Sequence, residues 1–208
     1  MASAFRLRGL EHDVSLYAKL IHSLEIRCRC GFEEIGCHGW EHVQRVRVLS
    51  RRIGIEEGAV LEILDLAALF HDSKREEEDH ARKSADHAEA ILRLDGFSEE
   101  FSRAVGDAIA SHSYTSGRVP NSIEGRVLSD ADRLDAMGAI GIYRTVQYNL
   151  EKGHSAARVT THISEKLLRL SGGMYTETGR RMARDREEIL VLYMESMLSE
   201  LRDSSSST

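Results

Sequence analysis

The stretch EEGAVLEILDLAALFHD, residues 56–72, decides how this chain folds. Its apolar residues recur three and four positions apart, which predicts a buried helix over 57–71. The run ends abruptly at His71 and Asp72, and a strongly charged segment follows. Neighbouring helical residues diverge by about 100°, yet both can reach one ion when the helix end points at it. We therefore interpret His71 and Asp72 as metal ligands presented by a rigid core helix.

The rest of the chain shows the same helical spacing and predicts an all-α protein. Gly54, Gly96 and Gly153 fall between periodic runs, where glycine can end a helix. Ser98 and Ser155 are typical helix starts. The predicted helices span 10–29, 38–53, 57–71, 82–95, 98–113, 122–150, 155–171 and 177–202.

The composition argues against several classes of function. A formal net charge of -6 over 208 residues disfavours broad electrostatic binding to nucleic acid or to an anionic membrane. No window approaches the roughly 18 apolar residues of a membrane span, and the first residues lack the apolar stretch of a signal peptide. The three cysteines are an odd number that fits a reducing compartment, so we expect a cytoplasmic protein.

Two further segments carry residues that bind metals. In HGWEHVQRV, His38 and His42 stand four apart and would share one face of a helix. Asp130, Asp132 and Asp135 lie in a segment rich in Ala, Gly, Leu and Ile, where a buried carboxylate is costly unless paired or bound to a cation. With the His-Asp pair they form a mixed nitrogen and oxygen set. Such a set suits one divalent ion with open water positions, such as Mn, Fe, Ni, Co or Mg.

The ordered motifs HVQRV (42–46), FHD (70–72) and DADRLD (130–135) resemble the HD-domain superfamily of metal-dependent phosphohydrolases. The segments HARKSADHAEAIL, AIASH and EKLLRLSGGMYTETGRRMARDR are similar to a subfamily of small bacterial and archaeal members, so the resemblance covers about residues 38–195. A second His-Asp pair, His12-Asp13, has no apolar run before it and fits no part of this pattern.

The resemblance implies an all-α, single-domain HD helical bundle over 1–203, with the metal site between central helices. Its motif core would span about 38–150 and its C-terminal helices 155–202, followed by a disordered tail at 204–208. By position, the implied metal ligands are His42, His71, Asp72 and Asp132. Asp130 is the rival for the last place. Asp135 would then accept a hydrogen bond from a ligand histidine or from Arg133.

The implied activity is hydrolysis of a phosphate ester or anhydride, in a nucleotide or related small metabolite, by attack of a metal-bound water. Basic residues near the motifs could hold the phosphate: Arg45, Lys74 and Arg75. Asp72 binds the ion, Glu76 or a histidine would protonate the leaving group, and His112 would contact the substrate.

The chain departs from the family pattern in two places. Members often carry aspartate where this chain has Gly39, and many place an acid three or four residues after the His-Asp doublet. Glu76 is the nearest match for that acid. A solvated surface loop is the alternative interpretation of 74–79, in which Lys74, Arg75 and Glu76 would have no role in the chemistry.

Other functions stay open as alternatives. If His80 and His112 point inward, a second metal becomes available, and with it the chemistry of a two-metal phosphodiesterase or of a di-iron HD-type oxygenase. A non-catalytic nucleotide-binding or regulatory HD module is another alternative, although such modules usually lack a ligand and this chain has all four. The helices after 155 could close the pocket or form the surface of a homodimer.

Overall fold

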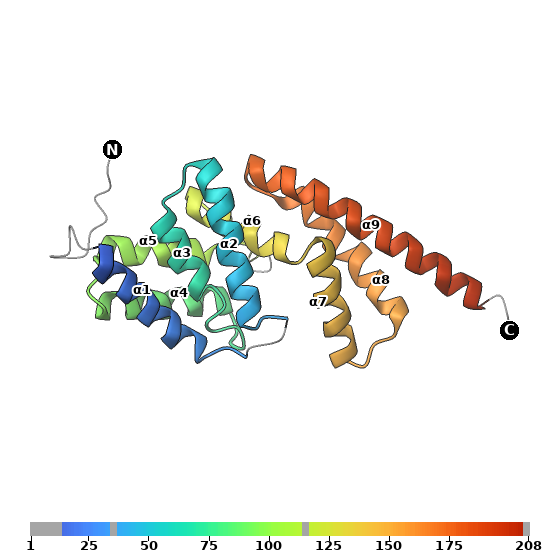
Figure 1. The fold of residues 1–208 in the computed structure, drawn as a ribbon, viewed down its shortest axis with the longest axis horizontal. Coiled ribbons are helices and arrows are strands. Elements are labelled where there is room, and N and C mark those ends of the chain that lie inside the picture. The colour runs from blue at the N-terminus through green and yellow to red at the C-terminus, as the bar shows by residue number, and fades with distance from the viewer. Residues whose placement is uncertain (1–13, 34–36, 114–116, 206–208) are drawn as a thin grey trace. The chain divides into compact units, whose positions relative to one another are not determined.

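The computed structural model describes residues 14–33, 37–113 and 117–205, and every regular element in these ranges is helical (Figure 1). Two compact units follow each other along the chain, one up to Ser129 and one from Asp130. The first contains α1 (Val14–Arg29), α2 (Trp40–Glu57), α3 (Leu61–Phe70), α4 (His80–Leu94) and α5 (Glu99–Ala110), and α6 (Ile123–Asp135) spans the boundary. The predicted all-α class is thus confirmed.

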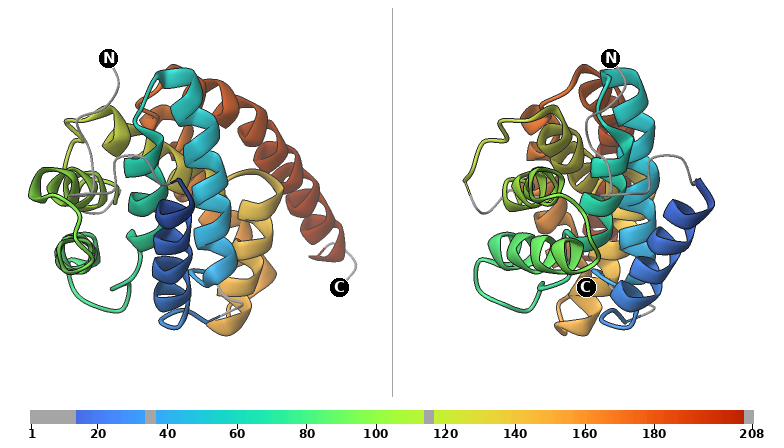
Figure 2. Two further views of the ribbon diagram at one scale, coloured as in Figure 1. Left: turned by 60° about the vertical axis from the view of Figure 1, so that its left-hand side comes forward. Right: turned by 90° about the vertical axis from the view of Figure 1, so that its left-hand side faces the viewer.

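Helix α3 lies at the centre of the first unit. Every residue from Leu66 to Phe70 is buried, so the end of this helix has no solvent-facing side. It packs against α1, α2, α4 and α5, and α4 and α5 lie side by side (Figure 1, Figure 2). Because burial stabilises apolar surface by roughly 25 cal/mol per Å², the most apolar helix takes this central place. Its C-terminus consequently delivers the next two residues, His71 and Asp72, into the interior.

The second unit consists of the end of α6 and the elements that follow it. These are α7 (Gly138–Glu151), α8 (Ala156–Glu165), the short 3₁₀ turns η2 (Leu167–Arg169) and η3 (Ser171–Gly173), and α9 (Glu177–Ser205). Helices α7 and α8 pack against each other and against α9 (Figure 1). The predicted helix over 155–171 therefore ends earlier, at Glu165, and the 3₁₀ turns replace its last part.

The single helix predicted over 122–150 is wrong, because the chain breaks between α6 and α7. The amide groups of Ala136 and Met137 bond to carbonyls three residues back and close α6. Gly138 then has a φ of 67°, a left-handed conformation that glycine adopts without steric cost. Nothing in the apolar spacing marks this break, since the periodic pattern continues on both sides of it.

Gly54 does not end a helix, contrary to the prediction from the glycine pattern. Helix α2 continues through it to Glu57 and ends at Gly58, which has a φ of 71° and donates its amide to the Gly54 carbonyl. The reason for glycine at 54 is close packing: a Cβ there would lie 2.3 Å from Leu64 Cδ1. A glycine that ends a helix and one that lets two helices approach look alike in the sequence.

The remaining sequence predictions have mixed outcomes. Ser98 caps α5 as predicted, because its hydroxyl accepts a hydrogen bond from the Phe101 amide at 3.1 Å. Ser155 precedes α8, but its side chain makes no capping hydrogen bond. Helix α9 reaches Ser205, so 204–205 are helical, while 206–208 of the predicted tail and the His12-Asp13 pair lie outside the described residues. The single domain over 1–203 stays a prediction.

Across the described ranges, no helix combines the length and the apolar character needed to cross a membrane.

Candidate metal centre

His71 and Asp72 follow α3 directly and are almost completely buried, with exposed fractions of 0% and 2%. The imidazole of His71 is fixed by a hydrogen bond from its Nδ1 to the Ala68 carbonyl oxygen at 2.7 Å. A carbonyl oxygen only accepts, so Nδ1 carries a proton, and in the neutral form of the ring Nε2 presents a lone pair. The end of α3 therefore supplies one imidazole nitrogen in the tautomer that binds a metal.

His42 brings a second imidazole from the first turn of α2. It is fully buried, and its Nε2 lies 3.1 Å from His71 Nε2 and 3.7 Å from an oxygen of Asp72, Oδ2. The distance from His71 Nε2 to the same oxygen is 3.8 Å. Ligands that each lie about 2.1 Å from one ion are separated by about 3.0–3.4 Å. The spacing of the two nitrogens lies in this range, and the 3.7 Å and 3.8 Å to Asp72 Oδ2 exceed it only slightly, so a small side-chain movement would bring this buried set around a divalent ion.

His38 also reaches Asp72, although it is not among the metal ligands that the family resemblance implies. Its Nδ1 lies 3.0 Å from Asp72 Oδ2, and its side chain is 36% exposed. His38, His42 and Asp72 form one of the groups whose ligand atoms lie within 4.8 Å of one another. The four-residue spacing from His42 was the available signal. This signal was weak because the spacing argument assumes a helix that starts at residue 38. In the structure α2 begins at Trp40, so His38 precedes the helix.

The other oxygen of Asp72, Oδ1, lies near a different group of side chains, which includes His80 and His112. His80 Nε2 lies 3.8 Å from it and His112 Nε2 lies 3.9 Å from it. Arg75 Nη1 lies 3.4 Å from the same oxygen and 3.0 Å from His80 Nε2. His112 is held in the same way as His71, because its Nδ1 donates a hydrogen bond to the Ile109 carbonyl at 2.6 Å. Both His80 and His112 thus point inward.

The charge on Asp72 is stabilised by its neighbours. Burial by itself would raise the pKa of this carboxyl group, because a buried charge loses its hydration. The imidazole of His71, a hydrogen bond from His38 and the charge of Arg75 act in the opposite direction. Together they hold the pKa of Asp72 well below its usual range. The side chain is therefore an anion at neutral pH, which is the form that binds a cation.

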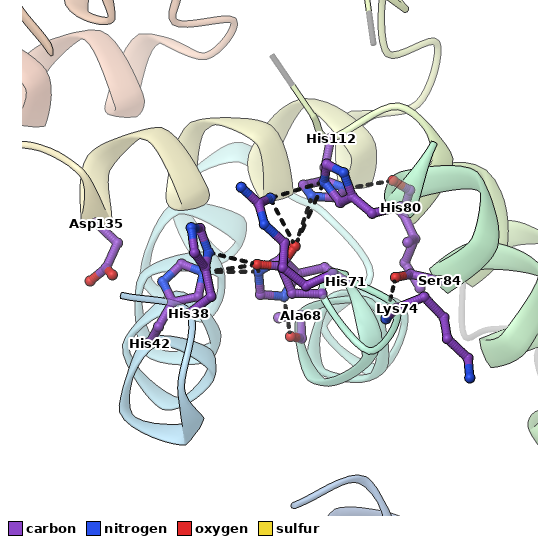
Figure 3. Close-up of polar contacts among 12 residues, drawn as sticks. His38, His42, Ala68, His71, Lys74, His80, Ser84, His112 and Asp135 are labelled. Atoms are coloured by element: carbon purple, nitrogen blue, oxygen red, sulfur yellow. Dashed lines mark hydrogen bonds and ion pairs between the residues drawn. The ribbon is translucent and has the colours of Figure 1, made fainter. Parts of the chain in front are cut away.

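The other predicted side chains have different surroundings. Lys74 extends away from the imidazoles in Figure 3, and its ammonium lies 3.8 Å from Glu77. Glu76 is exposed in the loop between α3 and α4. Arg45 lies on α2, where its guanidinium pairs with Glu41 at 3.6 Å. Of the basic residues predicted to hold phosphate, Arg75 is the one whose contacts tie it to Asp72.

The three acids of DADRLD have different surroundings within the second unit. Asp130 accepts hydrogen bonds from the Tyr175 amide at 2.8 Å, the Thr176 amide at 2.8 Å and the Thr176 hydroxyl at 2.7 Å. Burial nevertheless raises its pKa. Asp135 accepts a hydrogen bond from Arg144 at 2.8 Å, and the expected bond from a ligand histidine or Arg133 stays a prediction. Asp132 is half-buried on the same helix.

These surroundings favour Asp132 over Asp130 as a candidate ligand. Both oxygens of Asp130 are already used by the turn before α9, so binding an ion would require that turn to open. Arg133 donates to the Gly173 carbonyl and stacks over the Tyr175 ring, with 4.8 Å between its guanidinium carbon and the ring centre. The segment from Gly173 to Thr176 is thus held by Asp130 and Arg133 together.

Comparison with known proteins agrees with this geometry. The family model described as HD domain matches residues 39–137, which include α2, the His-Asp doublet and Asp132. The Bacillus subtilis protein YpgQ is 35% identical over 171 residues, which cover 78% of this chain and 83% of YpgQ.

Solved structures are similar over nearly the whole chain. The crystal structure of Bacillus subtilis YpgQ in complex with ADP matches with a TM-score of 0.73 and 32% identity, covering 86% of this chain and 97% of that one. An HD-superfamily hydrolase from Bacillus thuringiensis matches with a TM-score of 0.71 and 30% identity, covering 89% and 98%. A His-Asp doublet at the end of a buried helix, and these matches around it, lead to one conclusion: the chain belongs to the HD-domain family of hydrolases.

Proposed function

We propose that this protein is a divalent-metal-dependent phosphohydrolase that cleaves a phosphate ester or anhydride of a nucleotide or related metabolite. One observation carries the proposal. The Nε2 atoms of His42 and His71 and an oxygen of Asp72 converge within 3.8 Å of one another in the interior, beside the guanidinium of Arg75. An ion site next to a fixed cation is what phosphoryl transfer requires of a protein.

His42, His71 and Asp72 would hold the ion, with Asp132 as the fourth ligand on the strength of the family motif. A bound divalent ion lowers the pKa of a coordinated water and polarises a phosphoryl oxygen. The chain itself orients the ligands, because the Ala68 carbonyl sets the tautomer of His71. His38 holds Asp72 Oδ2 from the side that is open to solvent.

Arg75 is the residue that we propose for holding the phosphate. Its side chain is 37% exposed, so part of the guanidinium faces solvent while Nη1 contacts Asp72 and His80. Guanidinium groups bind phosphate oxygens through paired hydrogen bonds. His112 lines the same side of Asp72 and would contact the substrate. Glu76, the next residue after Arg75 in the exposed loop, remains the proposed proton donor to the leaving group.

A nucleotide is the substrate class that the comparisons favour. YpgQ, a relative that this chain matches along most of its length, was crystallised with ADP. A nucleoside phosphate offers the negative charge that an ion and Arg75 would neutralise together. The reaction would thus release phosphate or pyrophosphate from such a compound.

The proposal is tested with the isosteric change Asp72→Asn, which keeps the shape of the side chain and removes its charge. We expect the wild type to bind close to one equivalent of Mn²⁺ and to release phosphate or pyrophosphate from at least one compound of a nucleotide panel. Asp72→Asn should lose the metal and lower the activity by at least about 100-fold. Loss of a residue that only hydrogen-bonds to a metal ligand already costs up to about 100-fold, and loss of the ligand itself should cost at least as much.

Asp86→Asn is the matched control, since Asp86 is an exposed residue of α4 that pairs with Arg82. Its metal content and activity should equal those of the wild type. Hydrolysis that survives in metal-free Asp72→Asn would contradict the proposal. Metal binding without hydrolysis of any nucleotide or phosphate ester would favour a non-catalytic module or redox chemistry instead.

A further inference from the structure

Asp72 presents a second set of metal-type ligands on the side of Oδ1. The Nε2 atoms of His80 and His112 lie 3.8 Å and 3.9 Å from this oxygen. His71, Asp72 and His112 are also a group whose ligand atoms lie within 4.8 Å of one another. The carboxylate thus has nitrogen ligands near each oxygen, which is the arrangement of a bridge between two cations.

The nitrogens of this second set all present lone pairs. His112 donates from Nδ1 to the Ile109 carbonyl, so in the neutral form of the ring its Nε2 is an acceptor. His80 Nε2 lies 3.0 Å from Arg75 Nη1. A guanidinium only donates, so His80 Nε2 is an acceptor as well. Acceptors that face one another in a buried place need a positive charge or a donor among them.

Arg75 meets that need. Its Nη1 lies within 3.4 Å of Asp72 Oδ1 and within 3.0 Å of His80 Nε2, which are the atoms that a second ion would bind. An arginine side chain keeps its charge at every pH that a protein tolerates. The place of a second cation is thus taken by a residue of the chain.

We propose that Arg75 replaces a second metal ion and restricts this centre to one metal. The inference rests on the proposed function, since it presumes an ion at His42, His71 and Asp72. The guanidinium neutralises Asp72 Oδ1 and repels a second dication. Its solvent-facing part performs the phosphate contact that a second ion would otherwise make. The wild type therefore cannot catalyse reactions that require two metal ions, whereas a variant without Arg75 could bind both ions that such reactions need.

The test is the stoichiometry of Mn²⁺ binding, measured by native mass spectrometry and by electron paramagnetic resonance. We expect one tightly bound ion in the wild type and two in Arg75→Ala, the pair giving a spin-coupled signal. Arg75→Lys keeps a positive charge and should bind one. Adding His80→Ala to Arg75→Ala should return the count to one, because the second ion loses a ligand.

Lys74→Ala is the matched control. Lys74 adjoins Arg75, carries the same charge and is 38% exposed against 37% for Arg75, but its ammonium lies near Glu77. Its stoichiometry should remain one. Thermal unfolding followed by circular dichroism checks that each variant is folded, which a substitution in an exposed loop should allow.

The outcomes separate this inference from the proposed function. One ion in both the wild type and Arg75→Ala, or two ions in the wild type, overturns the role of Arg75 and leaves the metal-dependent hydrolase standing. A second ion in Lys74→Ala as well as in Arg75→Ala would show a general effect of charge and would also overturn it. No ion in the wild type and none in Arg75→Ala removes both proposals.

Discussion

Two histidines of the candidate site, His71 and His112, are each held by a hydrogen bond to a backbone carbonyl at the end of a helix. His71 lies just after the end of α3 and His112 lies two residues after the end of α5. Each donates from Nδ1 to the carbonyl oxygen three residues before it, at 2.7 Å and 2.6 Å. The last carbonyls of a helix lack the regular amide partner four residues on, and each imidazole donates to one of them, which fixes the proton on Nδ1. A bond to the chain's own backbone thereby orients each of these ligand nitrogens.

The cysteines allow a prediction at the scale of single residues. Cys28 is 7% exposed and its thiol donates to the Leu69 carbonyl at 3.2 Å, whereas Cys30 is exposed. Burial raises the pKa of Cys28 from 9.0 to about 12. Because the thiolate is the reactive form, Cys28 should react with iodoacetamide at pH 8 at least about 100-fold more slowly than Cys30.

The measurement uses variants that keep one thiol, Cys30→Ala with Cys37→Ala against Cys28→Ala with Cys37→Ala. In urea both thiols should react at similar rates. Equal rates in the folded protein would contradict the burial of Cys28. The same pKa shift makes the free energy of unfolding depend on pH. As the pH rises above about 9, the thiol of the unfolded chain ionises before the buried thiol does, which favours the unfolded state. The contribution of Cys28 to stability is therefore complete below about pH 9 and is lost at higher pH.

At the scale of elements, helix termini carry the candidate site. His42 lies in the first turn of α2, His71 and Asp72 follow α3, His80 begins α4 and His112 follows α5. The loop from 71 to 79 must therefore connect two termini that face each other, and Asp79 before α4 takes a left-handed φ of 50° there. This strained turn explains why the helical spacing alone places α4 two residues late.

The cap of α5 gives a prediction at this scale. Ser98 accepts a hydrogen bond from the Phe101 amide at 3.1 Å, one of the amides that have no partner inside the helix. Ser98→Ala should lower the free energy of unfolding by about 1 kcal/mol. Urea unfolding followed by circular dichroism measures this change.

Ser155→Ala is a matched control, because Ser155 holds the same position before α8 without a side-chain capping bond. Ser155→Ala should change the free energy of unfolding, measured on the transition in which α8 unfolds, by at most a few tenths of a kcal/mol. Equal losses in the two variants would mean that the serines act through something other than the cap, such as their preference for the extended backbone before a helix.

At the scale of the whole molecule, the all-α class and the family follow from the sequence because the apolar spacing and the ordered motifs are local signals. The convergence of His42, His71 and Asp72 was also predictable, since the family motif relates these three positions. The inward positions of His38 and His80 were not, because they depend on the turn before α2 and on the loop from 71 to 79. Neither segment has a periodic pattern that reveals its path.

The charged loop from 73 to 79 shows the same limit. Lys74, Arg75 and Glu76 are consecutive and equally polar in the sequence, so no pattern ranks them. In the structure the Lys74 amide donates to the Ser84 hydroxyl at 3.0 Å, and the loop turns so that Arg75 reaches Asp72. The identity of the residue that faces the site was therefore set by long-range contacts with α4. The interpretation of 74–79 as a solvated loop does not hold for Arg75, whose guanidinium contacts Asp72, whereas the Lys74 ammonium lies near Glu77 and the role of the exposed Glu76 stays a proposal.

The central claim is that the histidines around Asp72 bind a metal ion. The most direct test is the dissociation constant of Mn²⁺ for the metal-free wild type and for His71→Asn, with His22→Asn as the control because His22 is an exposed residue of α1. We expect one tight ion in the wild type and in the control, and at least about 100-fold weaker binding in His71→Asn, which loses a ligand. Binding of equal strength in all three proteins would contradict the account.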